Sequence, residues 1–469
     1  MTKVAIIGGG ITGLVAAFEL KRRGVPFTLF EASGRVGGVI QTHREHGFLA
    51  ENGPNTLLET SPKITELIQA LGIEPRRWYS NPQNNKRYIV RGGRPCAMPA
   101  SPPQFFTNSF FSWSAKFALF KEPFIKPSPP DLEESLAQFV KRRLGQEFLD
   151  YAINPFVAGV YAGDPERLSV KHAFAKLHAL EQKYGSLIKG QIQGARERKQ
   201  RNEVAKDRAK MMSFDQGLQV LTDALGAAVQ ESVRLNTPVE LLKKFQDGWA
   251  LSGTAGLLPP GPGGELGGRS PALPFTHVLL TSPAHRLAGL KIDSPAGGDL
   301  SLLGQIVYPP VTSYVLGFKR EDVAHPLDGF GVLVPKVEKR NCLGTLFTSS
   351  LFAGRAPVGH VTLTSYIGGM RAPELALKSP AEIRKLVLTD LRELLGVRGE
   401  PVWEHVKQWP KAIPQYEVGY GRFKDFMDAF EQRHAGILFA GHYRDGISLS
   451  DSILAGVKAA ERISPMALA

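Results

Sequence analysis

The sequence predicts an α/β protein, because a short apolar strand, a glycine turn and a helix follow one another at both ends of the chain. Residues 3–7 read KVAII and lead through a run of glycines into the amphipathic stretch LVAAFELKRRG. The last segment has the same pattern, with a strand over 437–440, a glycine turn and a helix that begins near Ser450. Two such units at opposite ends predict one discontinuous domain that the rest of the chain interrupts.

The first glycine turn has the spacing of a dinucleotide-binding motif. Gly8, Gly10 and Gly13 match G-x-G-x-x-G, in which the glycines permit the turn and let the backbone approach a pyrophosphate at the helix N-terminus. The next predicted strand, PFTLF, ends at Glu31, 18 residues after Gly13, where an acid accepts hydrogen bonds from ribose hydroxyls. This order of elements favours a nucleotide site over a structural glycine turn.

A basic residue beside a glycine pair follows the acid. Arg35 and Gly38 lie in RVGG, and Gly53 to Asn55 follow the alternating segment GFLAEN. The arginine and the open backbone amides suit a second phosphate, which favours a cofactor that lies extended through the domain. The alternative is a surface loop with a solvated arginine.

Composition narrows the class of protein. The 469 residues are 22% charged and 43% hydrophobic, which excludes a coiled coil, a collagen and wholesale disorder. Two cysteines, Cys96 and Cys342, exclude a disulfide scaffold and a clustered thiolate metal site. The net charge of +13 indicates an acidic partner. Composition alone does not decide whether that partner is nucleic acid, an anionic membrane or a small anion.

The terminal motifs resemble those of the FAD-dependent amine oxidase and protoporphyrinogen oxidase superfamily. The resemblance rests on GGGITG, EAS, RVGG and ENGPN near the N-terminus and on FAGHYRDGISL near the C-terminus. It implies a discontinuous Rossmann-like FAD-binding domain, a mixed-sheet substrate-binding domain and a helical membrane-facing insertion. The C-terminal turn lacks the cysteine of flavinylated amine oxidases, so we expect noncovalent FAD. The implied FAD contacts are Gly8, Gly10, Ile11, Thr12, Gly13, Glu31, Ala32, Arg35, Gly38, Gly53, Pro54, Asn55, Thr56, Val239, Trp409, Ile447, Ser448 and Leu449.

Blocks in the middle of the chain resemble the protoporphyrinogen oxidases within that superfamily. The clearest are NKRYIVRGGRPCAMPASPPQFF, DYAINPFVAGVYAGDPERLSV and WPKAIPQY. By this resemblance Arg87 binds a propionate of the tetrapyrrole, Leu333 and Leu346 enclose a pyrrole ring, and Gly159 offers its backbone. Tyr366 stacks on another ring, and its hydroxyl requires a partner. The alternatives are an exposed strand-edge arginine and plain core residues.

The resemblance implies FAD-dependent six-electron oxidation of protoporphyrinogen IX to protoporphyrin IX in haem or chlorophyll biosynthesis. The flavin takes three hydride equivalents, and we assign no general base. Oxygen and a quinone both stay open as electron acceptors, as do a homodimer and transfer of the product to ferrochelatase. One alternative is a coproporphyrinogen III oxidase that forms coproporphyrin III, and another is a non-enzymatic binder like the prenylated-GTPase chaperones that share the architecture.

Two surface segments bear on location. Residues 101–124 hold seven Phe and one Trp but only three charges, an interfacial composition whose alternative is interior packing. Residues 196–210 hold seven basic residues without interleaved aromatics, which disfavours nucleic acid and leaves anionic lipid or plain solvent. We therefore expect a cytoplasmic enzyme docked peripherally on the inner membrane through the 100–210 region.

The motifs also predict domain boundaries. We expect an FAD-binding domain, a substrate domain with a Gly/Pro surface loop over 253–274, and a helical insertion between their parts. The expected ranges are 1–84, 211–245 and 406–469 for the FAD-binding domain, 85–100 and 246–405 for the substrate domain, and 101–210 for the insertion.

Overall fold

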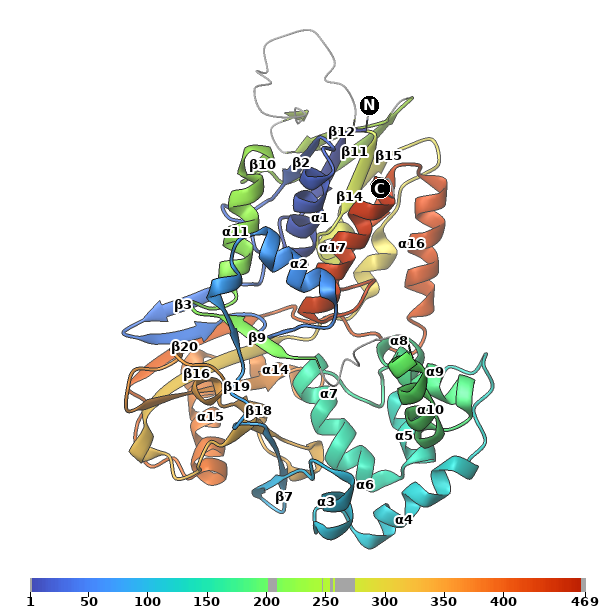
Figure 1. Ribbon diagram of the computed structural model, residues 1–469. Helices are drawn as coiled ribbons and strands as arrows, with labels where there is room; N and C mark the ends of the chain where they lie inside the picture. The colour runs from blue at the N-terminus through green and yellow to red at the C-terminus, as the bar shows by residue number, and fades with distance from the viewer. Residues whose placement is uncertain (1, 201–208, 247, 254–255, 258–274, 465–469) are drawn as a thin grey trace.

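The computed structural model describes residues 2–200, 209–246, 248–253, 256–257 and 275–464. The predicted Gly/Pro loop over 253–274 and the second half of the basic segment lie largely outside these ranges. Figure 1 shows a parallel sheet with its helices at one end of the molecule, and a large mixed sheet beside a cluster of helices at the other.

The first part is the cofactor domain, built on a five-stranded sheet in which every pairing is parallel. Its central strands are buried on both faces, which explains their continuous apolar sequences. In sheet order the strands are β10 (Val233–Arg234), β2 (Phe27–Phe30), β1 (Val4–Ile7), β14 (His277–Leu280) and β21 (Ile437–Phe439).

Helices cover one face of this sheet and a second sheet packs on the other. The helices of the first face are α1 (Ile11–Arg22), α2 (Pro62–Ala70), α11 (Gln219–Val229) and α17 (Leu449–Ile463). The second face packs against β11 (Leu241–Phe245), β12 (Gly248–Gly253), β13 (Gly256–Leu257), β15 (Lys291–Asp293), α12 (Ala284–Leu287) and α16 (Gly421–Arg433).

Two expected domain boundaries differ from the structure. Strand β14 pairs with both β1 and β21, so the residues around 277–280 belong to the cofactor domain and not to the substrate domain. Strand β20 (Trp403–Trp409) is an edge strand of the large sheet, so 406–409 lie outside the cofactor domain. An apolar run predicts a buried strand without indicating the sheet that it joins.

The second part is a seven-stranded mixed sheet, here called the large sheet. Helix α15 (Pro380–Leu395), which begins with a capping box between Ser379 and Glu382, packs on one face. In sheet order the strands are β20, β16 (Val311–Lys319), β19 (His360–Gly368), β18 (Cys342–Leu346), β17 (Gly329–Leu333), β7 (Lys86–Arg91) and β8 (Arg94–Ala97). Helices α13 (Thr348–Leu351) and α14 (Pro373–Ala376) lie in its connections.

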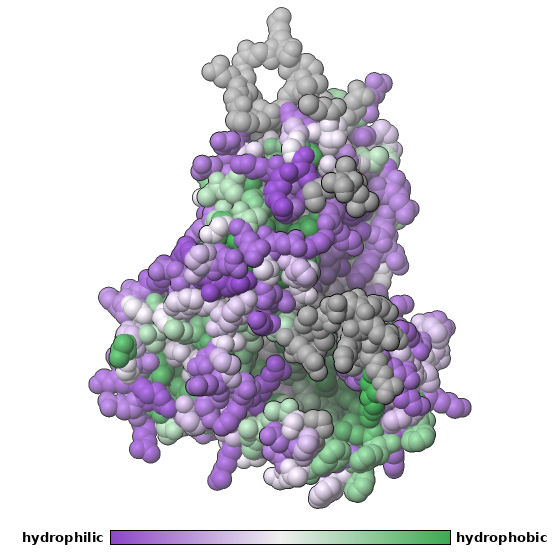
Figure 2. Space-filling model, viewed as in Figure 1, coloured by the Kyte–Doolittle hydropathy of each residue, from purple (hydrophilic) through white to green (hydrophobic). Residues whose placement is uncertain are grey.

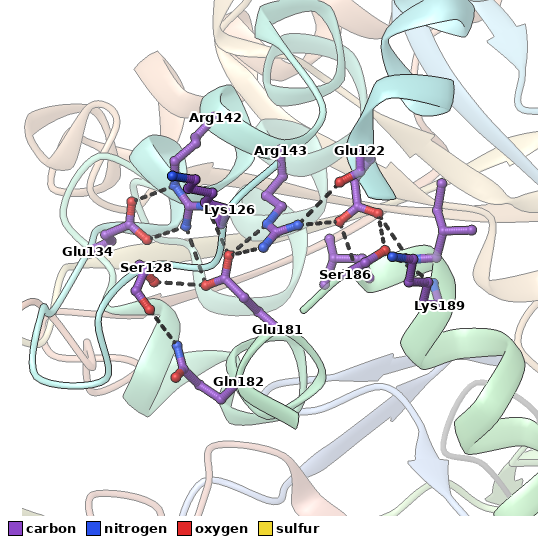
Figure 3. A network of polar contacts seen from close by, with 12 residues as sticks. Glu122, Lys126, Ser128, Glu134, Arg142, Arg143, Glu181, Gln182, Ser186 and Lys189 are labelled. Atoms are coloured by element: carbon purple, nitrogen blue, oxygen red, sulfur yellow. Dashed lines mark hydrogen bonds and ion pairs between the residues drawn. The ribbon is translucent and has the colours of Figure 1, made fainter. Parts of the chain in front are cut away.

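The third part is the helical insertion, and it confirms a helical segment between β8 and β9. A network of buried ion pairs centred on Arg143, Glu122 and Glu181 ties its helices together (Figure 3). The helices are α3 (Pro102–Thr107), α4 (Trp113–Lys121), α5 (Leu136–Arg143), α6 (Gln146–Phe148), α7 (Asn154–Tyr161), α8 (Val170–Ala173), α9 (Ala175–Tyr184) and α10 (Leu187–Gln200), with a π-helical turn η3 (Leu149–Ile153) before α7.

Two small sheets join the parts. They are the hairpin of β3 (Thr42–Glu45) and β4 (Phe48–Glu51), and a three-stranded sheet of β5 (Leu57–Leu58), β9 (Met211–Phe214) and β6 (Arg77–Tyr79). Short 3-10 turns complete the described chain: η1 (Glu74–Arg76), η2 (Glu122–Phe124), η5 (Gln230–Ser232), η6 (Ser301–Gln305), η7 (Arg320–Asp322) and η8 (Lys336–Glu338).

Candidate functional site

The glycine turn after β1 has the geometry that a pyrophosphate requires. A Cβ atom on Gly13 would lie 2.1 Å from the carbonyl oxygen of Gly8, so only glycine lets α1 pack this closely on the strand. A Cβ on Gly10 would meet nothing within 4 Å among the described residues, and no side chain caps α1 there. The first turn of α1, with Ile11 and Thr12, thus presents open backbone amides to a ligand.

Glu31 lies beside this turn at the end of β2. Its carboxylate accepts hydrogen bonds from the backbone N–H of Gly9 at 2.7 Å and of Ser33 at 2.8 Å. The backbone N–H of Thr237 donates to the Glu31 carbonyl at 2.9 Å, which brings half-buried Val239 into the same region. The structure therefore gathers the residues predicted for the adenosine end, and Ala32 lies exposed at its rim.

The loop that carries Arg35 leads away from the glycine turn. A Cβ on Gly38 would lie 3.2 Å from the Cα of Gly10, and a Cβ on Gly53 would lie 2.4 Å from the carbonyl oxygen of Val39. The Arg35 guanidinium donates to the carbonyl oxygens of Val36 and Gly38, so this side chain holds the loop in place. Gly10, Gly38 and Gly53 thus follow one another along one path through the domain.

The C-terminal turn closes over the other side of this path. Ser448 caps α17 by accepting from the backbone N–H of Asp451 at 3.0 Å, and Ile447 packs against both the cofactor domain and the helical insertion. The next residue after Leu449, Ser450, donates to the carbonyl oxygen of Leu58 at 2.6 Å. This contact places the start of α17 against the chain that follows Pro54 and Thr56.

The large sheet presents the predicted substrate residues on one face. In the β-ladders, Gly331 pairs with both Arg87 and Leu346, and Gly344 pairs with both Leu333 and Tyr366. Paired residues point to the same side of a sheet, and positions two apart along a strand do so as well. Four residues from four strands therefore share one face, which lies opposite to the face that packs on α15.

Helix α7 lies over this face. A Cβ on Gly159 would lie 2.6 Å from a terminal methyl of Leu333, so α7 approaches the sheet closely at that point. Leu333 packs against the apolar core of the helical insertion, and Gly159 itself is exposed. The predicted pair of Gly159 and Leu333 is thus in direct contact.

Arg87 lies exposed near the start of β7. Among the described residues, none makes a hydrogen bond or ion pair with its guanidinium, whereas its neighbour Lys86 pairs with Asp328. A planar cation without a protein partner on this face suits a carboxylate ligand.

Tyr366 and Trp409 connect the large sheet to the cofactor domain. The amide nitrogen of Asn55 donates to the Tyr366 hydroxyl, which supplies the partner that the sequence required. Burial raises the pKa of Tyr366 well above its ordinary value, so the hydroxyl stays protonated. The indole N–H of Trp409 donates to the backbone carbonyl of Asn52 at 2.6 Å.

Three residues that touch this region were missed by the sequence reasoning. The Tyr416 hydroxyl donates to the carbonyl oxygen of His442 at 2.6 Å and accepts from the N–H of Gly446 at 3.1 Å, so it braces the C-terminal turn. Asn52 and His405 contact each other from the two domains. Tyr416 lies in the block WPKAIPQY and Asn52 lies in ENGPN, so both motifs carried a signal, whereas nothing in the sequence singled out His405.

Glu51, at the end of β4, makes the stability of the folded protein depend on pH. Burial raises the pKa of Glu51 to about 7, against the opposing effects of the Leu218 N–H, the Thr42 hydroxyl and two arginines. The folded state therefore favours the protonated acid, so the stabilising contribution is complete below about pH 4.5 and is lost as pH rises through about 7.

We expect Glu51 to lower the free energy of unfolding by about 2 to 3 kcal/mol as the pH rises from about 4.5 to about 8. In Glu51→Gln this contribution to the pH dependence should be absent. Denaturant titrations of both proteins at several pH values, with FAD in constant excess, measure it. Parallel curves for parent and variant would contradict the assignment.

The residues present fit FAD. The glycine turn has room where the Gly10 side chain would be, an acid stands at the ribose position, and a path of glycines leads from there to the large sheet. The face that carries Arg87, Leu333, Leu346 and Tyr366 begins where this path ends, at Asn55. The sheet face thus offers an apolar surface directly beside the end of the path that suits an extended dinucleotide.

Comparisons with known proteins agree with this geometry. Residues 11–464 match the family described as flavin containing amine oxidoreductase. Protoporphyrinogen oxidase 2 of Arabidopsis thaliana is 36% identical over 98% of this chain and 93% of its own length, and the mitochondrial enzyme of Nicotiana tabacum is 35% identical over 98% and 94%. A coproporphyrinogen III oxidase of Bacillus subtilis is 29% identical over 96% and 95%. A solved structure from Exiguobacterium sp. 255-15 superposes with a TM-score of 0.80 at 24% identity, covering 98% of each chain.

Proposed function

Because the chain belongs to the flavin-containing amine oxidoreductase family, we propose that it oxidises protoporphyrinogen IX to protoporphyrin IX in tetrapyrrole biosynthesis. The protein is an FAD-dependent oxidoreductase, and the substrate follows from relatives that span nearly its whole length. The observation that carries the proposal is the single sheet face on which Arg87, Leu333, Leu346 and Tyr366 meet beneath α7.

The chain's own residues bind and orient the substrate. When bound, FAD would supply the electron-accepting chemistry: the macrocycle loses six electrons and six hydrogens as three hydride equivalents and three protons, with the flavin reoxidised by the acceptor after each hydride. Leu333 and Leu346 offer apolar contacts to a ring, and Arg87 offers a cation to a propionate. Holding the macrocycle on this face presents a ring carbon to the cofactor domain, and proximity of this kind accounts for much of a flavoenzyme's rate. Oxygen or a quinone as the electron acceptor, assembly into a homodimer and transfer of the product to ferrochelatase are predictions that stay untested.

The decisive experiment follows the visible spectrum of the purified yellow protein during anaerobic addition of protoporphyrinogen IX. We expect the flavin absorbance to bleach without an acceptor, because one FAD takes two of the six electrons, and we expect flavin absorbance to recover and porphyrin absorbance to develop once an acceptor is admitted. A colourless protein would support the non-enzymatic binder, and a flavin that stays oxidised would contradict the proposed reaction.

Coproporphyrinogen III is the second candidate substrate, because relatives at 29% and 27% identity are named coproporphyrinogen III oxidases. Its four carboxylates need more cations than one. On the described part of the substrate face, Arg87 is the exposed cation that lacks a protein partner, which favours the dicarboxylate. Parallel turnover assays decide between the two, and faster oxidation of coproporphyrinogen III would reverse the choice.

Arg87→Ala should raise KM for protoporphyrinogen about 10- to 100-fold and change kcat by less than about twofold, because a charged hydrogen bond to a propionate is lost in ground and transition states alike. Steady-state kinetics measure both constants. The matched control is Arg94→Ala, which removes an exposed arginine from the neighbouring strand β8. Equal KM values for parent and Arg87→Ala, or an equal rise for Arg94→Ala, would refute the propionate contact.

We also propose that the protein docks peripherally on the cytoplasmic face of the inner membrane through the helical insertion. The aromatic segment divides into two sets: Phe110 and Phe111 are buried, whereas others project into solvent. The projecting side chains are Trp113 (65% exposed), Phe117 (60%), Phe120 (60%) and Phe124 (86%). Figure 2 shows apolar surface over this end of the molecule, and four exposed aromatics on and just after one helix suit a bilayer interface. No helix in the described ranges is long and apolar enough to cross a bilayer.

The docking surface is tested by flotation with vesicles that contain phosphatidylglycerol. Replacing Trp113, Phe117 and Phe124 by Ser should reduce the floating fraction at least about tenfold, because each buried aromatic contributes about 2 kcal/mol. The control replaces two exposed apolar residues at the far end of the molecule, Leu235 and Phe245, by Ser. Parent protein that stays at the bottom of the gradient at low salt would contradict the proposal.

A further inference from the structure

Strand β20 lies across the hairpin of β3 and β4 and contacts it along one face. Its residues Trp403, His405 and Trp409 alternate along the strand and therefore point to the same side. Near the start of β20, the Trp403 indole donates to Glu45 at 2.9 Å. Further along the strand, His405 and Trp409 contact Asn52 instead, which directly precedes Gly53 of the cofactor path.

Asn52 is buried, and side chains of the large sheet bind both its backbone and its side chain. Its backbone carbonyl accepts the Trp409 indole N–H at 2.6 Å, and its side-chain oxygen Oδ1 accepts from His405 Nε2 at 2.6 Å. Its own backbone N–H donates to the carbonyl oxygen of Gln41 in the cofactor domain at 2.8 Å. Asn52 thus links the two domains through its backbone and its side chain.

His405 is suited to a fixed role. Its ring stacks on His43 with 4.2 Å between centroids, and burial together with the neighbouring His43 and Lys407 lowers its pKa to about 4, although Glu45 acts in the opposite direction. The ring is neutral at physiological pH, so it donates one hydrogen bond from Nε2 without bringing a charge to the cofactor segment. Three residues further on, Asn55 makes the matching contact to Tyr366 on β19.

We propose that Asn52, His405 and Trp409 are positioning residues that hold the segment 53–56 against FAD, so that the large sheet sets how tightly the cofactor domain binds it. The segment includes Gly53, whose Cβ position is blocked by Val39, and so it has little freedom to shift without losing the path described above. The proposal depends on the FAD site alone and not on the identity of the substrate.

The test measures FAD affinity of the full-length apoprotein by flavin fluorescence quenching. Trp409→Phe removes one indole hydrogen bond and should weaken FAD binding about fivefold, and His405→Phe should have an effect of similar size. His405→Gln retains an N–H donor and should recover most of the affinity. The matched control is Trp403→Phe, which removes an indole hydrogen bond from the same strand to Glu45 in the hairpin, away from Asn52.

Affinities of Trp409→Phe and His405→Phe within twofold of the parent would overturn the proposal. So would an equal loss in Trp403→Phe, because it would show general loosening of the hairpin. If Trp409→Phe does not fold, the comparison of His405→Phe with His405→Gln decides alone, and failure of the glutamine to recover affinity counts against the proposal. None of these readouts needs a porphyrinogen, so they stand apart from the test of the reaction.

Discussion

Gly13→Ala is expected to yield a protein without flavin and with a weakened cofactor domain. The new methyl group would lie 2.1 Å from the carbonyl oxygen of Gly8 and 2.8 Å from the hydroxyl of Thr281, and both belong to the packed interior between α1 and the sheet. Overpacking of this kind costs about 1 to 3 kcal/mol, and the displaced first turn should lower FAD affinity at least about 100-fold. Thermal unfolding of the apoprotein and FAD titration measure the two effects.

Gly10→Ala is the matched comparison, because its methyl group would meet nothing within 4 Å among the described residues, and its φ of −71° suits any side chain. This variant should unfold like the parent as an apoprotein and still lose FAD, since the methyl group takes space that the pyrophosphate needs. Normal FAD binding in Gly10→Ala would show that the dinucleotide lies elsewhere.

Arg143→Met should destabilise the helical insertion by about 3 to 5 kcal/mol, because it leaves the buried Glu122 without a cation and takes one of two arginines from the buried Glu181. The Arg143 guanidinium pairs with Glu122 at 2.8 Å and Glu181 at 2.5 Å, and none of the three side chains is exposed (Figure 3). Burial acts to raise the pKa of Glu122, yet hydrogen bonds from Ser186 and two backbone amides and the charge of Arg143 hold it below its ordinary value.

Denaturant unfolding of the variant, followed by circular dichroism, measures this loss. The control is Arg142→Met: Arg142 is partly exposed, its partner Glu181 keeps Arg143, and its other partner Glu134 lies nearer the surface, so we expect a smaller effect. The triple variant with Arg143→Met, Glu122→Gln and Glu181→Gln should recover part of the lost stability, because it removes the unpaired charges. A single variant as stable as the parent would contradict the role of the network.

The terminal strand, turn and helix units could be predicted because their signals are local. Gly8 to Gly13 and Glu31 lie within one continuous stretch, and glycine spacing, apolar runs and a single acid suffice to place them. The sheet that each later strand joins could not be predicted in this way. The run HVLL of β14 indicates a buried strand equally well in either sheet, and its partners β1 and β21 lie far away in the sequence.

Side-chain contacts between domains were beyond the same reasoning. His405 and Asn52 are 353 positions apart, and no periodicity connects them. In the aromatic segment, composition indicated an interfacial stretch but could not separate buried Phe111 from Phe124, because that choice depends on which helices pack beside them. The resemblance to a family, and not periodicity, predicted both Arg87 and Tyr366 as substrate contacts. The register of the large sheet shows that they share a face.

The strand order of the parallel sheet also constrains when the protein can acquire its cofactor during synthesis. Strand β21 (Ile437–Phe439) forms one edge, and α17 lies against α1, where a Cβ on Gly456 would lie 2.6 Å from the carbonyl oxygen of Thr12. A nascent chain that has emerged only as far as residue 436 holds the first glycine turn but lacks the edge strand and helix that close over it. Domains generally fold as units as the chain leaves the ribosome. All strands of the large sheet and all helices of the insertion precede β21 and α17 in the chain, so these two parts can form before the domain that binds FAD closes.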